Sequence, residues 1–157
     1  MTLRGAVRIV GYAPRYRDAF RDLNLEWIER DFTVEESDRV MLENPEDAII
    51  SRGGEVFVAL DGDVVVGVCS LIPASSSSWQ LAKMAVSPQA RGRGIGRLLA
   101  QAAFDYAKSA GASQIELFTN TVLEPAMGLY RSLGFVEAPF EGAEHKRSNI
   151  RMVRAVQ

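Results

Sequence analysis

The sequence predicts an α/β fold in which a mixed β-sheet carries helices on both faces. The strongest observation is the stretch 95–110, where apolar residues recur at helical spacing up to Gly111, a residue typical of helix ends. Strand-like apolar runs at 79–86 and 113–119 precede and follow this helix. A strand, a helix and a strand in this order form a crossover unit, so we expect the two strands to be parallel neighbours.

The N-terminal part is expected to add one strand and two helices. Alternating apolar residues predict a strand at 6–12, and helical spacing predicts a helix at 14–32. A second helix is expected at 33–44, with Thr33 as its N-cap and Glu36 as the acidic partner in a capping box.

The remaining elements complete the sheet. Two β-rich runs within 53–73 flank Asp61-Gly62, a dipeptide typical of tight turns, and they predict a hairpin. A helix is expected from Pro125 to Gly134, followed by strands at 135–136 and 149–156. No repeat or long linker divides the sequence, so we expect a single domain over residues 1–157.

Composition limits the classes of function. The formal net charge of −2 argues against the strongly basic surface typical of nucleic-acid binding. No apolar run approaches the ~20 residues that span a bilayer, and Arg8 interrupts the apolar stretch near the N-terminus, unlike in a signal peptide. We therefore expect a cytoplasmic protein without a membrane partner. The single Cys69 is expected to be a buried strand residue rather than a catalytic thiol.

The segment before the strongest helix is rich in glycine and arginine, and it reads SPQARGRGIGR from Ser87 to Arg97. The first N–H groups of a helix lack intrahelical partners and the helix dipole is positive there, so a glycine-rich turn at that point can bind a phosphate. Arginine side chains can add charge-assisted hydrogen bonds. The alternative is a turn that uses glycine only for its positive φ. Three glycines at alternate positions favour an anion site.

Two well-known phosphate motifs do not match this segment. A P-loop continues with Gly-Lys-Ser/Thr, where this sequence has Gly96-Arg97-Leu98. The dinucleotide fingerprint G-x-G-x-x-G would need a glycine where Arg97 stands. A nucleotide-binding oxidoreductase is therefore a weak alternative.

What does fit is the pattern R-x-x-G-x-G at Arg91, Gly94 and Gly96, after a strand that ends in KMAV, with AMGLYRSLGF downstream. These two motifs, in this order and spacing, resemble the acyl-CoA motif and the C-terminal helix signature of the GNAT superfamily of acetyl-CoA-dependent N-acyltransferases. The resemblance implies a three-layer α+β domain with a twisted, largely antiparallel sheet whose central parallel pair splays apart. It also implies direct transfer of an acetyl group from acetyl-CoA to a primary amine in a ternary complex, without a metal.

The resemblance implies that acetyl-CoA lies between the strand ending at Val86 and its parallel neighbour. The pantetheine arm would bind backbone groups around Met84, Ala85 and Val86. The pyrophosphate would bind the amides of the glycine-arginine segment, and its arginines would reach the phosphates. The residues implied in this role are Arg91, Gly92, Arg93, Gly94, Ile95, Gly96 and Arg97.

Tyr130 matches the family tyrosine that protonates the departing thiolate of the cofactor. This chemistry suits a phenol, because the pKa of a tyrosine near 10 lies close to that of a thiol, about 8.5. The alternative is that Tyr130 packs in the core, since LYRSLGF is also a helix-packing pattern.

The group that removes a proton from the amine is not assigned by the motifs. Gln80 stands where many relatives carry a glutamate base, and a glutamine can only orient water or substrate. His145 is expected to be a solvated loop residue, although its unperturbed pKa lies near neutrality. Gln80 favours the alternative of a catalytically weak, acyl-CoA-binding module. The candidates for the base are Glu26, Glu29, Asp31, Glu116, Glu124 and His145.

Asn120 has two interpretations. Many relatives carry an asparagine at the position of Leu123 that contacts the cofactor, and Asn120 can supply that contact instead or be a simple turn residue. Substrate specificity is expected to come from the N-terminal helices, the ASSSS connector and the loop APFEGAEHKRSN. The resemblance also makes a homodimer an expectation.

Overall fold

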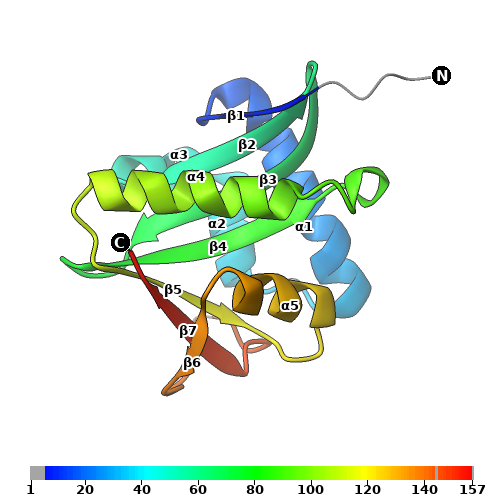
Figure 1. The fold of residues 1–157 in the computed structure, drawn as a ribbon. Coiled ribbons are helices and arrows are strands. Elements are labelled where there is room, and N and C mark those ends of the chain that lie inside the picture. Colours follow the sequence, from blue (N-terminus) through cyan, green and yellow to red (C-terminus); the bar gives the residue numbers. More distant parts are fainter. Residues whose placement is uncertain (1–5, 144, 157) are drawn as a thin grey trace.

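The computed structural model describes residues 6–143 and 145–156, and these form one seven-stranded sheet (Figure 1). The predictions about the extreme N-terminus and about Glu144 of the APFEGAEHKRSN loop lie outside the described residues. Neighbouring strands are antiparallel except β4 and β5, which are parallel, so the predicted mixed sheet and its parallel pair are confirmed. The spatial order is β1-β2-β3-β4-β5-β7-β6, with strands at Val7–Val10, Glu55–Asp61, Val64–Pro73, Ser78–Val86, Gln114–Thr119, Val136–Ala138 (β6) and Ile150–Ala155 (β7).

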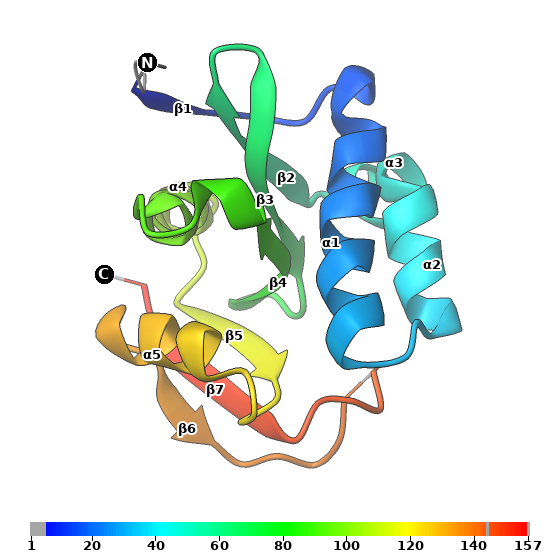
Figure 2. The ribbon, with the colours of Figure 1, turned by 90° about the vertical axis from the view of Figure 1, so that its right-hand side faces the viewer.

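Helices cover both faces of the sheet and give the predicted three layers (Figure 2). One face carries α1 (Arg17–Asp31), α2 (Glu36–Glu43) and the short α3 (Pro45–Ala48). The other face carries α4 (Ile95–Ser109) and α5 (Glu124–Ser132). Short 3₁₀ turns at Pro14–Tyr16, Ile50–Arg52 and Pro88–Ala90 connect these elements.

Each face of the sheet has its own apolar core. Leu99 and Phe104 of α4 belong to the core on one face, and Phe20 and Ile28 of α1 belong to the core on the other. The amphipathic pattern that predicted α4 is therefore the pattern of side chains that this helix buries. Cys69 lies in the α4 core and is fully buried, as expected.

Two local predictions were wrong by one or two residues. The N-cap of α2 is Glu35 rather than Thr33, and the capping box pairs Glu35 with Asp38 rather than Thr33 with Glu36. Asp38 is fully buried and ion-paired, which fixes this register. The hairpin loop is Gly62-Asp63 rather than Asp61-Gly62, because the positive φ of +61° falls on the glycine as the first loop residue.

The parallel strands β4 and β5 pair only along a short stretch and then separate. Ser78, Trp79 and Gln80 pair with Gln114, Ile115 and Glu116, so the expected splay of this pair is confirmed. On its other edge β4 contains a bulge, because Val68 and Ser70 of β3 pair with Ala85 and Ala82. Within the described part of the chain, no helix has the length and apolar character that crossing a membrane requires.

Candidate functional site

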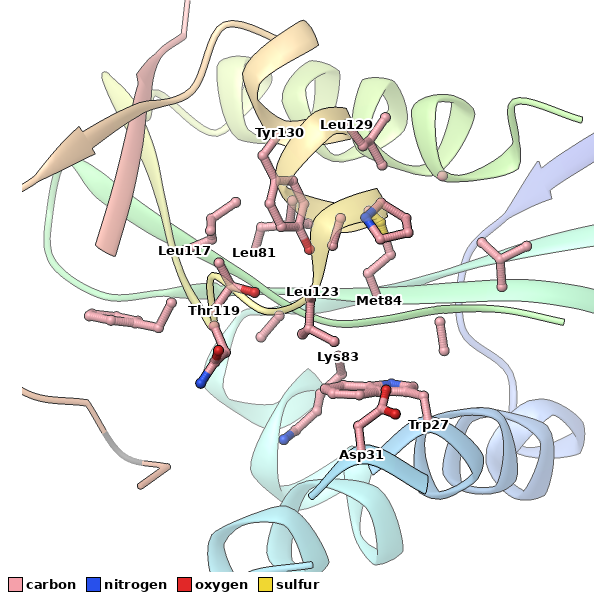
Figure 3. A pocket seen from close by; sticks show the side chains of 18 of the residues that line it. Trp27, Asp31, Leu81, Lys83, Met84, Leu117, Thr119, Leu123, Leu129 and Tyr130 are labelled. Atoms are coloured by element: carbon pink, nitrogen blue, oxygen red, sulfur yellow. The ribbon is translucent and has the colours of Figure 1, made fainter. Parts of the chain in front are cut away.

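The splay of β4 and β5 opens a cavity of about 720 Å³ (Figure 3). One end is formed by the glycine-arginine segment and the start of α4, and the middle by 81–86 of β4 and 117–119 of β5. The other end is formed by α1 and the loop around His145. β4 and β5 form no ladder beyond Gln80, so the backbone that borders the cavity has no strand partner across the gap.

The N-terminus of α4 faces the first end of the cavity without a side-chain cap. Gly94 is the N-cap residue and makes no capping hydrogen bond. The amides of Ile95, Gly96 and Arg97 follow it, and the first N–H groups of a helix lack intrahelical partners. These amides and the positive end of the helix dipole make this part of the cavity suitable for a phosphate.

The local structure explains why each of these three positions is a glycine. Gly92 and Gly94 have φ of +82° and +74°, which side-chain-bearing residues rarely adopt. At Gly96, a Cβ would come within 2.9 Å of Leu129 Cδ2, so glycine allows α4 to approach α5 closely. The turn interpretation thus accounts for the glycines, and the case for an anion rests on the uncapped helix start and the neighbouring arginines.

The three arginines of the segment have different surroundings. Arg91 and Arg97 line the cavity, and Arg97 donates a hydrogen bond to Ser132 Oγ at 2.7 Å. Arg93 is the one predicted cofactor residue that does not line the cavity, and its guanidinium pairs with Asp61 Oδ2 at 2.8 Å. The remaining predicted cofactor residues all line the cavity: Met84, Ala85, Val86, Gly92, Gly94, Ile95, Gly96, Asn120 and Tyr130.

Tyr130 projects from α5 with its hydroxyl directed into the cavity (Figure 3). Its ring packs edge-on against Phe135 at 5.9 Å between centroids, so the core anchors the ring while the hydroxyl faces the cavity. Burial raises the pKa of Tyr130 to about 12, and the phenol therefore keeps its proton at neutral pH. This is the state that a proton donor requires.

Of the six predicted candidates for the base, Asp31 and His145 line the cavity. Gln80 also lines it, on the same strand as Lys83. Glu116 is ion-paired with Arg151 at 2.8 Å, and Glu26 is ion-paired with Arg30 at 2.8 Å. Glu26, Glu29, Glu116 and Glu124 are not among the residues that line the cavity.

Asn120 is bonded as a turn residue at the edge of the cavity. Its Oδ1 accepts a hydrogen bond from the amide of Val122 at 2.9 Å. Its Nδ2 donates to the carbonyl oxygen of Arg147 at 2.7 Å, which joins the end of β5 to the loop before β7.

A buried polar cluster, which sequence reasoning missed, supports the end of the cavity opposite α4. We call Asp38, Lys83, His145 and Arg147 the Lys83 cluster. Lys83 Nζ donates to Asp38 Oδ1 at 2.6 Å and lies 2.9 Å from His145 Nε2. Arg147 donates from both terminal nitrogens to the Asp38 carboxylate. Because the side chains of Asp38 and Lys83 are 0% and 2% exposed, this ion pair is almost free of solvent screening.

The expectation that His145 is a solvated residue was wrong. Its side chain is 14% exposed, and its ring nitrogens lie 2.6 Å from Ser37 Oγ and 2.9 Å from Lys83 Nζ. Burial and the ammonium of Lys83 lower the pKa of His145 to about 4. The ring is therefore neutral at pH 7, with Nε2 accepting from Lys83 and the proton on Nδ1.

The carboxylates and imidazole of this region have a spacing that a metal ion could use. Ligand atoms of Glu35, Asp38 and His145 lie within 4.8 Å of one another. However, the Asp38 carboxylate already binds the ammonium of Lys83 and the guanidinium of Arg147, so its charge is satisfied by the protein's own cations.

Comparisons with known proteins agree with this geometry. A family model described as the acetyltransferase (GNAT) family matches residues 21–135, a stretch that contains β4, α4, β5, α5 and all but the first turn of α1. The chain belongs to the GNAT acetyltransferase family. The resemblance of its motifs to this family is thereby confirmed.

Two relatives match parts of this GNAT chain in sequence. N-acetyltransferase 8F1 of Rattus norvegicus is 33% identical over 91 residues, which cover 55% of this chain and 41% of that protein. Mycothiol acetyltransferase of Rhodococcus erythropolis is 49% identical over 59 residues, covering 37% of this chain and 20% of that protein. The matches thus span less than half of either relative's length.

Solved structures with the GNAT fold match over nearly the whole chain. An acetyltransferase of the GNAT family from Staphylococcus aureus Mu50 has a TM-score of 0.87 at 23% identity, covering 97% of this chain and all of that one. The yncA protein of Salmonella typhimurium, solved with its cofactor acetyl-CoA, has a TM-score of 0.77 at 21% identity, covering 98% of this chain and 95% of that one. At these identities the comparison establishes the fold.

The neutral state of His145 predicts a specific dependence of stability on pH. The unfolded chain binds a proton at His145 below about pH 6.5, whereas the folded chain does so only near pH 4. Stability from this group is therefore complete above pH 6.5 and is lost as the pH falls to 4, by up to about 3 kcal/mol. Denaturant unfolding from pH 7 to pH 4 should show a flatter decline for His145→Gln than for the wild type. Parallel declines would contradict the assignment.

Proposed function

We propose that this chain transfers an acetyl group from acetyl-CoA to a primary amine. The observation that carries the proposal is the position of Tyr130, whose protonated hydroxyl faces a cavity that begins at the uncapped N-terminus of α4. The cofactor fits this arrangement in two respects. The helix start and Arg91 and Arg97 offer donors to phosphates, and the unpaired backbone of β4 offers hydrogen bonds to the amides of a pantetheine arm.

The reaction is a direct displacement at the thioester carbonyl. The amine nitrogen forms a bond to the carbonyl carbon as the carbon–sulfur bond breaks, and the sulfur leaves with the bonding electron pair. Tyr130 gives its phenolic proton to that sulfur, and the amine gives up a proton to solvent or a base. Gln80 lines the cavity and orients the amine or a water molecule there. It does not act as the base, because a glutamine side chain does not accept a proton at neutral pH.

The second candidate is a module that binds acyl-CoA with little or no turnover, and Gln80 at the position expected for the base is what favours it. The predicted homodimer and cytoplasmic location stay predictions.

One prediction concerns the end of the cavity at the N-terminus of α4, where we propose that the pyrophosphate binds. Gly94→Asp adds a carboxylate where the pyrophosphate is proposed to bind, and a Cβ at this position meets no protein atom within 4 Å. We expect calorimetry to show loss of acetyl-CoA binding by at least about tenfold, roughly the effect of one lost charge-assisted contact. Gly111→Asp is the matched control, because Gly111 also has a positive φ and open surroundings but lies at the far end of α4. Equal affinities in the two variants would contradict the proposed phosphate site.

Another prediction distinguishes the proposed enzyme from the alternative of a binding module. Tyr130→Phe removes only the proton donor, so kcat should fall by about 10²-fold or more while the Kd of acetyl-CoA stays within about twofold. Tyr106→Phe is the control, since Tyr106 packs against Phe57 and Trp79 and does not line the cavity. Release of free thiol would be followed with a panel of primary amines. Unchanged kcat in Tyr130→Phe would remove its catalytic role, and a wild type that binds acetyl-CoA without releasing thiol would favour the module.

A further inference from the structure

We infer that the acceptor is a primary amine with an apolar body and no carboxylate, held between Trp27 and Asp31 of α1. This inference rests on the proposed acetyl transfer and adds the substrate class and the residues that select it. Trp27 and Asp31 are four residues apart, so they share one face of the helix, and both line the cavity. Figure 3 shows them across the cavity from Tyr130, which leaves the space between the two walls for the reacting groups.

The side chain of Trp27 lines the cavity and is held in place by neighbouring residues. Its indole Nε1 donates to Asn24 Oδ1 at 3.1 Å, and Asn24 Nδ2 in turn donates to the carbonyl oxygen of Lys83 at 3.1 Å. The guanidinium of Arg147 lies 5.6 Å from the centre of the indole ring. An aromatic ring fixed in this way offers an apolar contact at low entropic cost.

The cations that line this end of the cavity are ion-paired with neighbouring carboxylates. The described cations that line it are each engaged with carboxylates: Arg30 with Glu26 and Asp31, and Lys83 and Arg147 with the buried Asp38. Glu35, which pairs with Arg147, does not line the cavity, and neither do Glu26 and Asp38. Asp31 is the carboxylate that lines this end among the described residues.

Asp31 is the carboxylate best placed to bind an incoming ammonium. It lines the cavity, and its side chain is 31% exposed. Arg30 donates to both Asp31 oxygens, at 3.2 and 3.1 Å. Each carboxylate oxygen has a second lone pair, so a bound ammonium can share the carboxylate with Arg30. An amino acid would instead bring a carboxylate that must compete with Glu26 and Asp31 for Arg30 and with Asp38 for Lys83 and Arg147, while it loses its own hydration.

The test compares phenethylamine with phenylalanine, which share an aromatic body and a primary amine and differ by one carboxylate. With the full chain and saturating acetyl-CoA, we expect kcat/KM to be at least about tenfold higher for phenethylamine. Asp31→Asn should raise the KM for phenethylamine about five- to tenfold, while the KM for acetyl-CoA stays nearly unchanged. Glu29→Gln is the matched control, because Glu29 is an exposed acid on the same helix that does not line the cavity.

The possible results distinguish a failure of this inference from a failure of the proposed acetyl transfer. Equal or better turnover of phenylalanine, or an unchanged KM for the amine in Asp31→Asn, would overturn the inference and leave acetyl transfer intact. An equal rise in KM for Glu29→Gln would overturn the role of Asp31, because only general charge would then matter. Binding of acetyl-CoA without acetylation of either amine would overturn the proposed function, and the inference with it.

Discussion

The conformation of Lys83 is the constraint on which the cavity depends. Its φ of +54° is unusual for a residue with a side chain and costs about 1–3 kcal/mol. Three elements offset this cost: Asn24 of α1 binds the Lys83 carbonyl, Asp38 of α2 binds its ammonium, and His145 of the loop lies against the same nitrogen. The bulge that contains Lys83 lies in the part of β4 that no longer pairs with β5, where the cavity opens.

This arrangement links the two ends of the cavity to different layers of the fold. The end of the cavity at 91–97 depends on α4 and the glycine turns, which lie on one face of the sheet. The opposite end depends on α1, α2 and the His145 loop, which the Lys83 cluster holds together on the other face. The splayed strands lie between these layers. In the reaction that we propose, an amine reaches the thioester from the α1 side and Tyr130 reaches it from the α5 side.

Sequence patterns predicted the residues that line the α4 end of the cavity far better than those that line the α1 end. The glycine turns, the start of α4 and Tyr130 depend on neighbours close in sequence, so short motifs encode them. Lys83 and His145 are 62 residues apart, and Asp38 and Arg147 are 109 apart. Single-sequence periodicity contains no signal for such pairs, and alternation along β4 does not reveal a bulge. For the same reason His145 was wrongly expected to be solvated, and the α2 cap was placed two residues early.

The most direct test of the proposed site is a crystal structure of the chain with a non-hydrolysable acetyl-CoA analogue. We expect the pyrophosphate to lie on the amides of 92–97, the pantetheine arm to follow 81–86 of β4, and the sulfur to lie within hydrogen-bond distance of Tyr130 Oη. The acetyl group should then face Trp27 and Asp31. An analogue bound outside the gap between β4 and β5, or one whose sulfur is remote from Tyr130, would contradict this arrangement.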